Sequence, residues 1–123
     1  MRLRFSALPW AFALLASACG SGDTASVAGP IDPGRGAAVY GEACASCHGD
    51  DLRGSDRGPS HLSIVYEPNH HPDESFRRAI RNGVPQHHWT FGAMPAIEGL
   101  SADDVTAVIG YVRAVQASEG FDQ

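Results

Sequence analysis

Residues Cys44-Ala45-Ser46-Cys47-His48 form a C-x-x-C-H sequence, which is the spacing at which a haem is attached covalently to protein. Two thiols three residues apart on one helical turn can each form a thioether with a vinyl group of the same porphyrin. The adjacent imidazole of His48 then reaches the iron from one side. We therefore predict one haem c per chain, attached through Cys44 and Cys47, with His48 as the proximal axial ligand of the iron.

A C-x-x-C pair also occurs in redox dithiols and as half of a zinc site. The zinc interpretation needs two more ligands from scattered histidines, and a thioredoxin-like dithiol needs a βαβ pattern, which this sequence lacks. Cys19 is the only other cysteine of the chain, so a disulfide framework and a four-cysteine zinc site are excluded. Haem attachment is the favoured interpretation of the motif.

The charge of the chain is acidic. Its 123 residues include nine basic and fourteen acidic side chains, with a formal charge of −5, and every basic residue is an arginine. This balance argues against nucleic acid and anionic lipid headgroups as partners. We expect redox proteins instead, such as a reductase, a dehydrogenase or a terminal oxidase. The length allows one small domain, whose limited core a buried prosthetic group would complete.

The N-terminus has the features of an export signal. Residues 1–18 contain two early arginines, a mostly apolar run that ends at Leu15, and small residues after it. This segment is too short to cross a bilayer comfortably as a helix. The small residues before Cys19 resemble a bacterial lipobox, although Ala16 stands where leucine is usual. We expect a lipidated Cys19 on the periplasmic side of a bacterial membrane, with a soluble periplasmic protein as the alternative.

The remaining chain divides into a linker and a helical domain. Residues 19–32 are rich in small and polar residues and predict a flexible linker, and residues 33–123 form the domain. Asp32 is expected to cap the first helix, Gly83 to follow the second, and Ser101 to cap the third. The predicted helices span 33–43, 72 or 73–82, and 102–116. No stretch has the length and alternation of a strand, so the predicted fold class is all-α.

The segments between the predicted helices are expected to be loops. Residues 49–71 and 84–99 contain repeated glycine and proline and show no sustained periodicity. A short apolar run, Leu62 to Tyr66, is too brief for an independent element. It is expected to line the haem pocket or to form core beneath a loop.

The second predicted helix carries acid-before-base pairs at i,i+4 spacing, Asp73 with Arg77 and Glu74 with Arg78. Such pairs stabilise a helix by about 0.2–0.5 kcal/mol each. We expect these pairs to form and the arginines to lie mainly on a solvated face.

The sixth ligand of the iron decides the function. Met94 precedes Pro95 in the loop before the last helix, and proline restricts the methionine backbone to extended conformations. A lone methionine is more often a core residue, but the haem motif and this loop favour Met94 as the distal ligand. A thioether favours ferrous iron and gives a six-coordinate centre that exchanges electrons without opening to substrate. The other nitrogen ligands that the sequence offers are His61, His70, His71, His87 and His88.

The ordered motifs resemble those of a class I monohaem cytochrome c. They are Gly36-x-x-x-Tyr40, Cys44-x-x-Cys47-His48, Gly58-Pro59, Gly92-Ala93-Met94-Pro95 and a last helix containing Tyr111. The resemblance covers about residues 33–117. It implies a cytochrome c fold, in which three main helices and loops surround one haem.

The resemblance also implies roles for individual residues. Gly36 and Tyr40 would pack against Val108 and Tyr111, and Met94 would be the distal ligand. The carbonyl oxygen of Pro59 would accept a hydrogen bond from Nδ1 of His48 and so orient the ring. Lysine-ringed members of the family dock acidic partners. This chain has no lysine and departs from that pattern.

The leading hypothesis is a non-enzymatic periplasmic one-electron carrier whose haem iron cycles between Fe(III) and Fe(II). The first alternative is a haem enzyme or sensor that binds peroxide or a diatomic gas, since paired His87 and His88 could serve as ligands or as acid–base groups. The second alternative is a fixed cytochrome subunit of an oxidase or dehydrogenase complex. Exposed loop histidines are the simplest interpretation of the paired histidines, and surface binding of copper or zinc is a weaker one.

Overall fold

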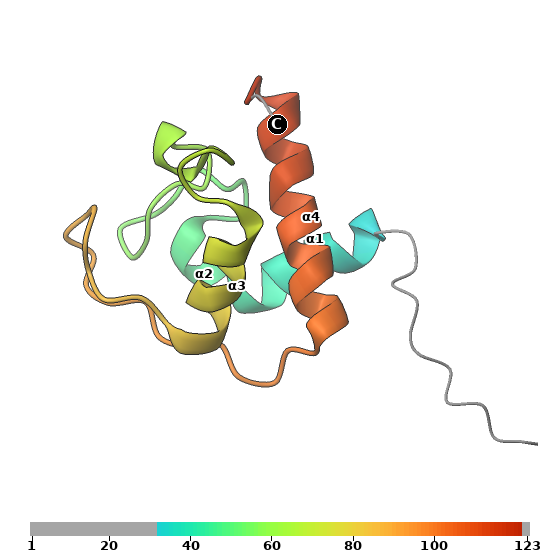
Figure 1. Cartoon of the computed structure of the whole chain (residues 1–123), viewed down its shortest axis with the longest axis horizontal. Coiled ribbons are helices and arrows are strands. Elements are labelled where there is room, and N and C mark those ends of the chain that lie inside the picture. The colour runs from blue at the N-terminus through green and yellow to red at the C-terminus, as the bar shows by residue number, and fades with distance from the viewer. Residues whose placement is uncertain (1–31, 122–123) are drawn as a thin grey trace, which may run out of the picture.

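The computed structural model describes residues 32–121, and this part of the chain is helical without a strand (Figure 1). The prediction of an all-α cytochrome c fold is confirmed. The elements are α1 (Pro33–Ala43), α2 (Ala45–His48), the 3-10 helix η1 (Ile64–Tyr66), α3 (Asp73–Asn82) and α4 (Ala102–Ser118). The predicted export signal, the predicted linker up to residue 31 and Cys19 lie outside the described residues. Between residues 32 and 121, no helix has the length and apolar character needed to cross a membrane.

One end of each of the three main helices is set by local capping, as predicted. The Asp32 carboxylate accepts a hydrogen bond from the Gly34 amide at 2.9 Å at the start of α1. At the start of α4, the Ser101 hydroxyl accepts from the Asp104 amide, and the Asp104 carboxylate accepts from the Ser101 amide at 3.0 Å. Gly83 ends α3 with φ of +69°, a conformation that side chains rarely tolerate. The structure extends α4 to Ser118, two residues beyond the predicted end.

Helices α1 and α4 cross at a glycine (Figure 1). A Cβ atom added to Gly36 would overlap the carbonyl oxygen of Ala107 and lie 2.7 Å from Cβ of Tyr111. Tyr40, one helical turn later, packs its ring 5.6 Å from that of Tyr111. The absence of a side chain at Gly36 therefore lets the two backbones approach, and Ala107 is the residue that faces it.

Arg113 connects α4 to the loop after η1. Its side chain is 9% exposed and donates to Asp73 at 2.8 Å, to the Tyr66 carbonyl at 2.7 Å and to the His71 carbonyl. Its guanidinium also lies 4.8 Å from the ring centre of Phe76. The predicted i,i+4 pairs of α3 are wrong. Asp73 pairs with Arg113, because the buried guanidinium needs a counter-charge, and Glu74 pairs with Arg77 at 3.9 Å.

The short apolar run, Leu62 to Tyr66, lies partly in the core and partly at the surface. Leu62 and Tyr66 pack on the core cluster, as expected. Ile64 is 72% exposed, so the prediction for this residue is wrong. The last three residues of the run form the 3-10 helix η1, in which neighbouring side chains point in different directions, so one apolar residue faces outward.

Candidate functional site

The two cysteines and His48 lie on the short helix that follows α1 without a loop. Cys44 ends α1 and begins α2, and its amide donates to the Tyr40 carbonyl at 2.9 Å. The amide of His48 in turn donates to the Cys44 carbonyl at 3.0 Å. Both thiols are free and partly buried. Burial, and then the neighbouring Cys47, raise the pKa of Cys44 to about 11, so this group is a protonated thiol at neutral pH.

His48 presents one specific nitrogen for metal binding. Its ring is buried, and Nδ1 lies 2.8 Å from the carbonyl oxygen of Pro59, which is the contact expected from the resemblance. A carbonyl oxygen can only accept a hydrogen bond, so Nδ1 carries the proton and Nε2 keeps its lone pair. Burial lowers the pKa of His48 despite the opposing effect of this hydrogen bond. The ring is therefore neutral and can act as a ligand through Nε2.

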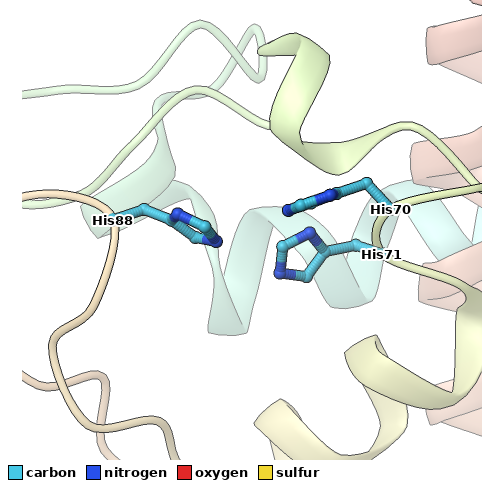
Figure 2. Close-up of side chains that lie close together, drawn as sticks. All are labelled: His70, His71 and His88. Atoms are coloured by element: carbon cyan, nitrogen blue, oxygen red, sulfur yellow. The ribbon is translucent and has the colours of Figure 1, made fainter.

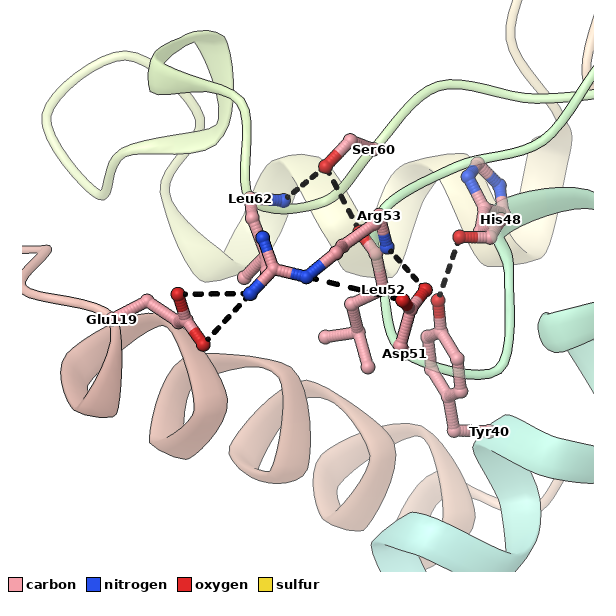
Figure 3. Close-up of polar contacts among 8 residues, drawn as sticks. All are labelled: Tyr40, His48, Asp51, Leu52, Arg53, Ser60, Leu62 and Glu119. Atoms are coloured by element: carbon pink, nitrogen blue, oxygen red, sulfur yellow. Dashed lines mark hydrogen bonds and ion pairs between the residues drawn. The ribbon is translucent and has the colours of Figure 1, made fainter.

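The loop that carries Pro59 is held by its own hydrogen bonds (Figure 3). The Ser60 hydroxyl donates to the Leu52 carbonyl at 3.0 Å and accepts from the Leu62 amide at 3.0 Å. The Tyr40 hydroxyl donates to the His48 carbonyl at 3.5 Å. These contacts fix the position of the Pro59 carbonyl oxygen relative to the imidazole that it orients.

An ion pair anchors the same loop to the end of α4 (Figure 3). Arg53 donates through Nη2 to both carboxylate oxygens of Glu119 at 3.1 Å. The Arg53 amide donates to the carboxylate of Asp51 at 3.1 Å. Both side chains of the ion pair are exposed, so it contributes little to global stability.

His61 is a buried residue whose position the sequence did not indicate. Its ring stacks on that of His48 with the centroids 4.0 Å apart. Its Nδ1 lies 3.4 Å from the Tyr40 hydroxyl. Burial, and then the neighbouring His48, keep the pKa of His61 well below its usual value, so the ring is neutral. The sequence offered His61 as a possible ligand of the iron. In the structure its ring stacks on the ring of His48.

A cavity of about 470 Å³ is lined by both cysteines, His48 and Met94. Its volume is in the range of about 300–1,000 Å³ usual for small-molecule and cofactor sites. The remaining wall is largely apolar and includes Tyr40, Tyr66, Phe76, Ile80, Val84, Ile97, Val108, Ile109 and Val112. A site of this kind suits a large apolar ring system with a metal at its centre.

Met94 has a fixed backbone at the edge of this cavity. It forms an isolated antiparallel bridge with Val84, with both hydrogen bonds at 2.9 Å. Gly83 lets the chain pass close by, because a Cβ atom there would lie 2.6 Å from the Met94 carbonyl oxygen. The bridge connects the end of α3 with the loop before α4, so Met94 occupies a defined place in the cavity wall.

The residues that line the cavity fit a haem c. The pair of free thiols provides two thioether positions on one short helix. Nε2 of His48 and the sulfur of Met94 provide a nitrogen and a soft thioether, the donor set of an electron-transferring haem. The largely apolar wall suits the apolar faces of such a group.

Four histidines gather at the mouth of the cavity. His70, His87 and His88 are exposed and His71 is partly buried, and all except His70 line the cavity. Partial desolvation and the neighbouring imidazoles lower the pKa values of His71 and His88. Arg113 adds to this effect at His71.

The comparisons with known proteins agree with this geometry. Residues 32–112, more than half of the chain, match the family described as cytochrome C oxidase, cbb3-type, subunit III. Neither the curated proteins nor the solved structures include a significant match to this chain. The chain therefore belongs to this family of c-type cytochrome domains, whose cofactor is a covalently bound haem c and whose chemistry is electron transfer.

Proposed function

We propose that this protein is a one-electron carrier with a six-coordinate centre. Its haem c supplies the Fe(III)/Fe(II) couple when bound. Cys44 and Cys47 would hold the group by thioethers, His48 would be its proximal ligand, and Met94 would be its distal ligand. Pro59 orients the ring of His48 through its Nδ1 proton. The observation that carries the proposal is that both thiols, the oriented imidazole and Met94 line one largely apolar cavity.

Carbon monoxide binding separates a carrier from a haem enzyme or sensor. In a carrier, the Met94 sulfur occupies the sixth position, so the reduced protein at neutral pH binds carbon monoxide slowly and incompletely. The Met94→Ala variant should bind it rapidly and fully, because the position is then open. Thr90→Ala, exposed on the same loop, is the matched control and should behave as the wild type. Rapid and full binding by the wild type would favour the enzyme or sensor and contradict the carrier.

A fixed subunit of a terminal oxidase is the second candidate, and the family description favours it. Its haem chemistry would be the same, but its partner would be permanent. Solubilised native membranes distinguish the two functions. Co-purification with the other oxidase subunits through a high-salt wash supports the fixed subunit, and release as a single chain supports the mobile carrier.

We further propose that the domain is exported and held on the periplasmic side of the membrane by a lipid on Cys19. The export features of residues 1–18 and the small residues before Cys19 support this. Membrane fractionation tests it. Cys19→Ala should move the protein to the soluble fraction, and the control Ser21→Ala should leave it with the membrane. An unchanged distribution of Cys19→Ala would exclude the lipid as the anchor.

A further inference from the structure

Three histidines from two separate loops bring their ring nitrogens together (Figure 2). His70 and His71 follow η1, and His88 belongs to the loop between α3 and α4. One nitrogen of each ring can be chosen so that all three lie within 4.8 Å of one another. Figure 2 shows the three rings turned toward a common point between the loops. No charged carboxylate or thiol takes part in this group, so any bound ion would be held by nitrogen donors.

His71 is already oriented as a metal-binding histidine is. Its Nδ1 lies 2.6 Å from the Val65 carbonyl oxygen, so Nδ1 carries the proton and Nε2 keeps its lone pair. The carbonyl of His71 accepts a hydrogen bond from the buried Arg113. The backbone and one edge of the ring are thus both fixed. At protein metal sites, the second ring N–H of a histidine ligand usually donates a hydrogen bond to an acceptor such as a carbonyl oxygen.

We propose that His70, His71 and His88 bind one divalent transition-metal ion of the zinc or copper class. Imidazole nitrogen suits both ions, and three such ligands leave a fourth position for water. Bonds of about 2.0–2.1 Å in a tetrahedral site place the ligand nitrogens about 3.4 Å apart. For the nitrogens that lie within 4.8 Å of one another, the required approach is at most about 1.4 Å. Rotation of the exposed His70 and His88 side chains can accomplish this.

The ion would join two loops that border the cavity. His71 and His88 line both the proposed metal site and the cavity that contains Met94 in its wall. His88 lies in the same loop as Met94, and His71 is connected to α4 through Arg113. A bound ion would therefore tether the Met94 loop to the body of the domain. The site is separate from the iron ligands and does not depend on the proposed carrier function.

Zinc titration of the untagged holoprotein tests the site. The protein is treated with a chelator, exchanged into metal-free buffer and titrated with zinc chloride in a calorimeter. Of the three other histidines, His48 and His61 are buried, and the exposed His87 is tested separately by substitution. We expect saturation at one ion per chain. His88→Ala should weaken binding at least about tenfold, since even loss of a supporting contact costs a metal site about 10–100-fold.

His87→Ala is the matched control, because His87 is exposed, adjacent to His88 and outside the group of three. It should retain the wild-type dissociation constant within about threefold, and His71→Ala should behave as His88→Ala does. The haem absorption spectrum verifies that each variant is folded. Zinc should also raise the midpoint of thermal unfolding in the wild type and in His87→Ala only, as binding to the native state requires.

Three results would overturn the assignment. The first is weak binding that does not saturate at one ion per chain. The second is wild-type affinity in both His71→Ala and His88→Ala. The third is an equal loss of affinity in His87→Ala, which would show a different set of ligands.

Discussion

The ring of His61 lies against the ring of His48, with the centroids 4.0 Å apart and the planes inclined by 21°. The Pro59 carbonyl oxygen holds Nδ1 of His48 at 2.8 Å. His48 is therefore supported on one face and at one edge, and Nε2 remains available. The Tyr40 hydroxyl lies 3.4 Å from Nδ1 of His61 and connects this pair of rings to α1.

Replacing His61 with alanine should destabilise the protein. The ring is buried among aromatic neighbours, so its loss leaves a cavity beside His48. We expect the free energy of unfolding to fall by about 2–4 kcal/mol, the usual result of truncating a large buried side chain. Urea denaturation of the holoprotein measures this. His87→Ala, an exposed substitution, should change it by less than about 0.5 kcal/mol. Equal stabilities of the two variants would show that the stacked ring does not support the site.

Two glycines of α1 should respond to alanine in opposite ways. The added methyl group of Gly36→Ala would overlap the carbonyl of Ala107, so the helices must separate. We expect a loss of about 1–3 kcal/mol, typical of overpacking. Gly41 has open space around its Cα atom, so Gly41→Ala should stabilise the helix by up to about 1 kcal/mol. Thermal unfolding of both variants checks the pair. A stable Gly36→Ala would contradict the close crossing of α1 and α4.

The features predicted correctly from the sequence depend on nearby residues. Asp32 caps α1, Gly83 ends α3 and Ser101 caps α4, and in each case the contact joins residues at most four apart. The C-x-x-C-H motif is equally local, so the cofactor was predictable as well. The contact between His48 and Pro59 followed from the resemblance to a known family and not from the spacing of the residues.

The features that were missed or wrong depend on contacts between distant residues. Arg113 has the character of a surface residue, yet it is buried and pairs with Asp73, forty positions away. Asp73 was expected to pair within its own helix, because the local spacing allows it. His61 stacks on His48 only because the intervening loop folds back. No periodicity in the sequence reports such contacts.

The capping box of α4 should make stability depend on pH below about 4. The hydrogen bond from the Ser101 side chain, and then that from Arg35, lower the pKa of Asp104. The folded pKa lies below the unfolded value of about 3.9, so the stabilisation is complete above that pH and is lost as the pH falls through the folded pKa. The Asp104→Asn variant lacks this stabilisation at every pH. In urea denaturation, the variant should therefore have a lower free energy of unfolding than the wild type at pH 7, and this difference should become smaller toward pH 3.

The neighbouring Asp103→Asn is the control for this pH dependence, because Asp103 is exposed in the same helical turn. The difference in free energy of unfolding between Asp103→Asn and the wild type should not become smaller toward pH 3. A pH-independent difference for Asp104→Asn would show that the carboxylate charge does not contribute to the cap.

Both cysteines should attach the haem covalently. In denatured wild-type protein, mass spectrometry should find the chain and haem as one covalent species. Cys44→Ala or Cys47→Ala keeps one thioether, so part of the haem should stay attached, and the double variant should lose it on acid extraction. Ser46→Ala, between the two thiols and exposed, should retain it fully. Covalent haem in the double variant would contradict attachment at this motif.

The near-infrared spectrum of the ferric protein tests most directly whether Met94 binds the haem iron. If the Met94 sulfur is the sixth ligand of an electron-transferring haem, the wild type shows a thioether-to-iron charge-transfer band. This band should disappear in Met94→Ala and persist in the control Thr90→Ala. An unchanged spectrum in Met94→Ala would contradict the assignment of Met94 and, with it, the six-coordinate carrier.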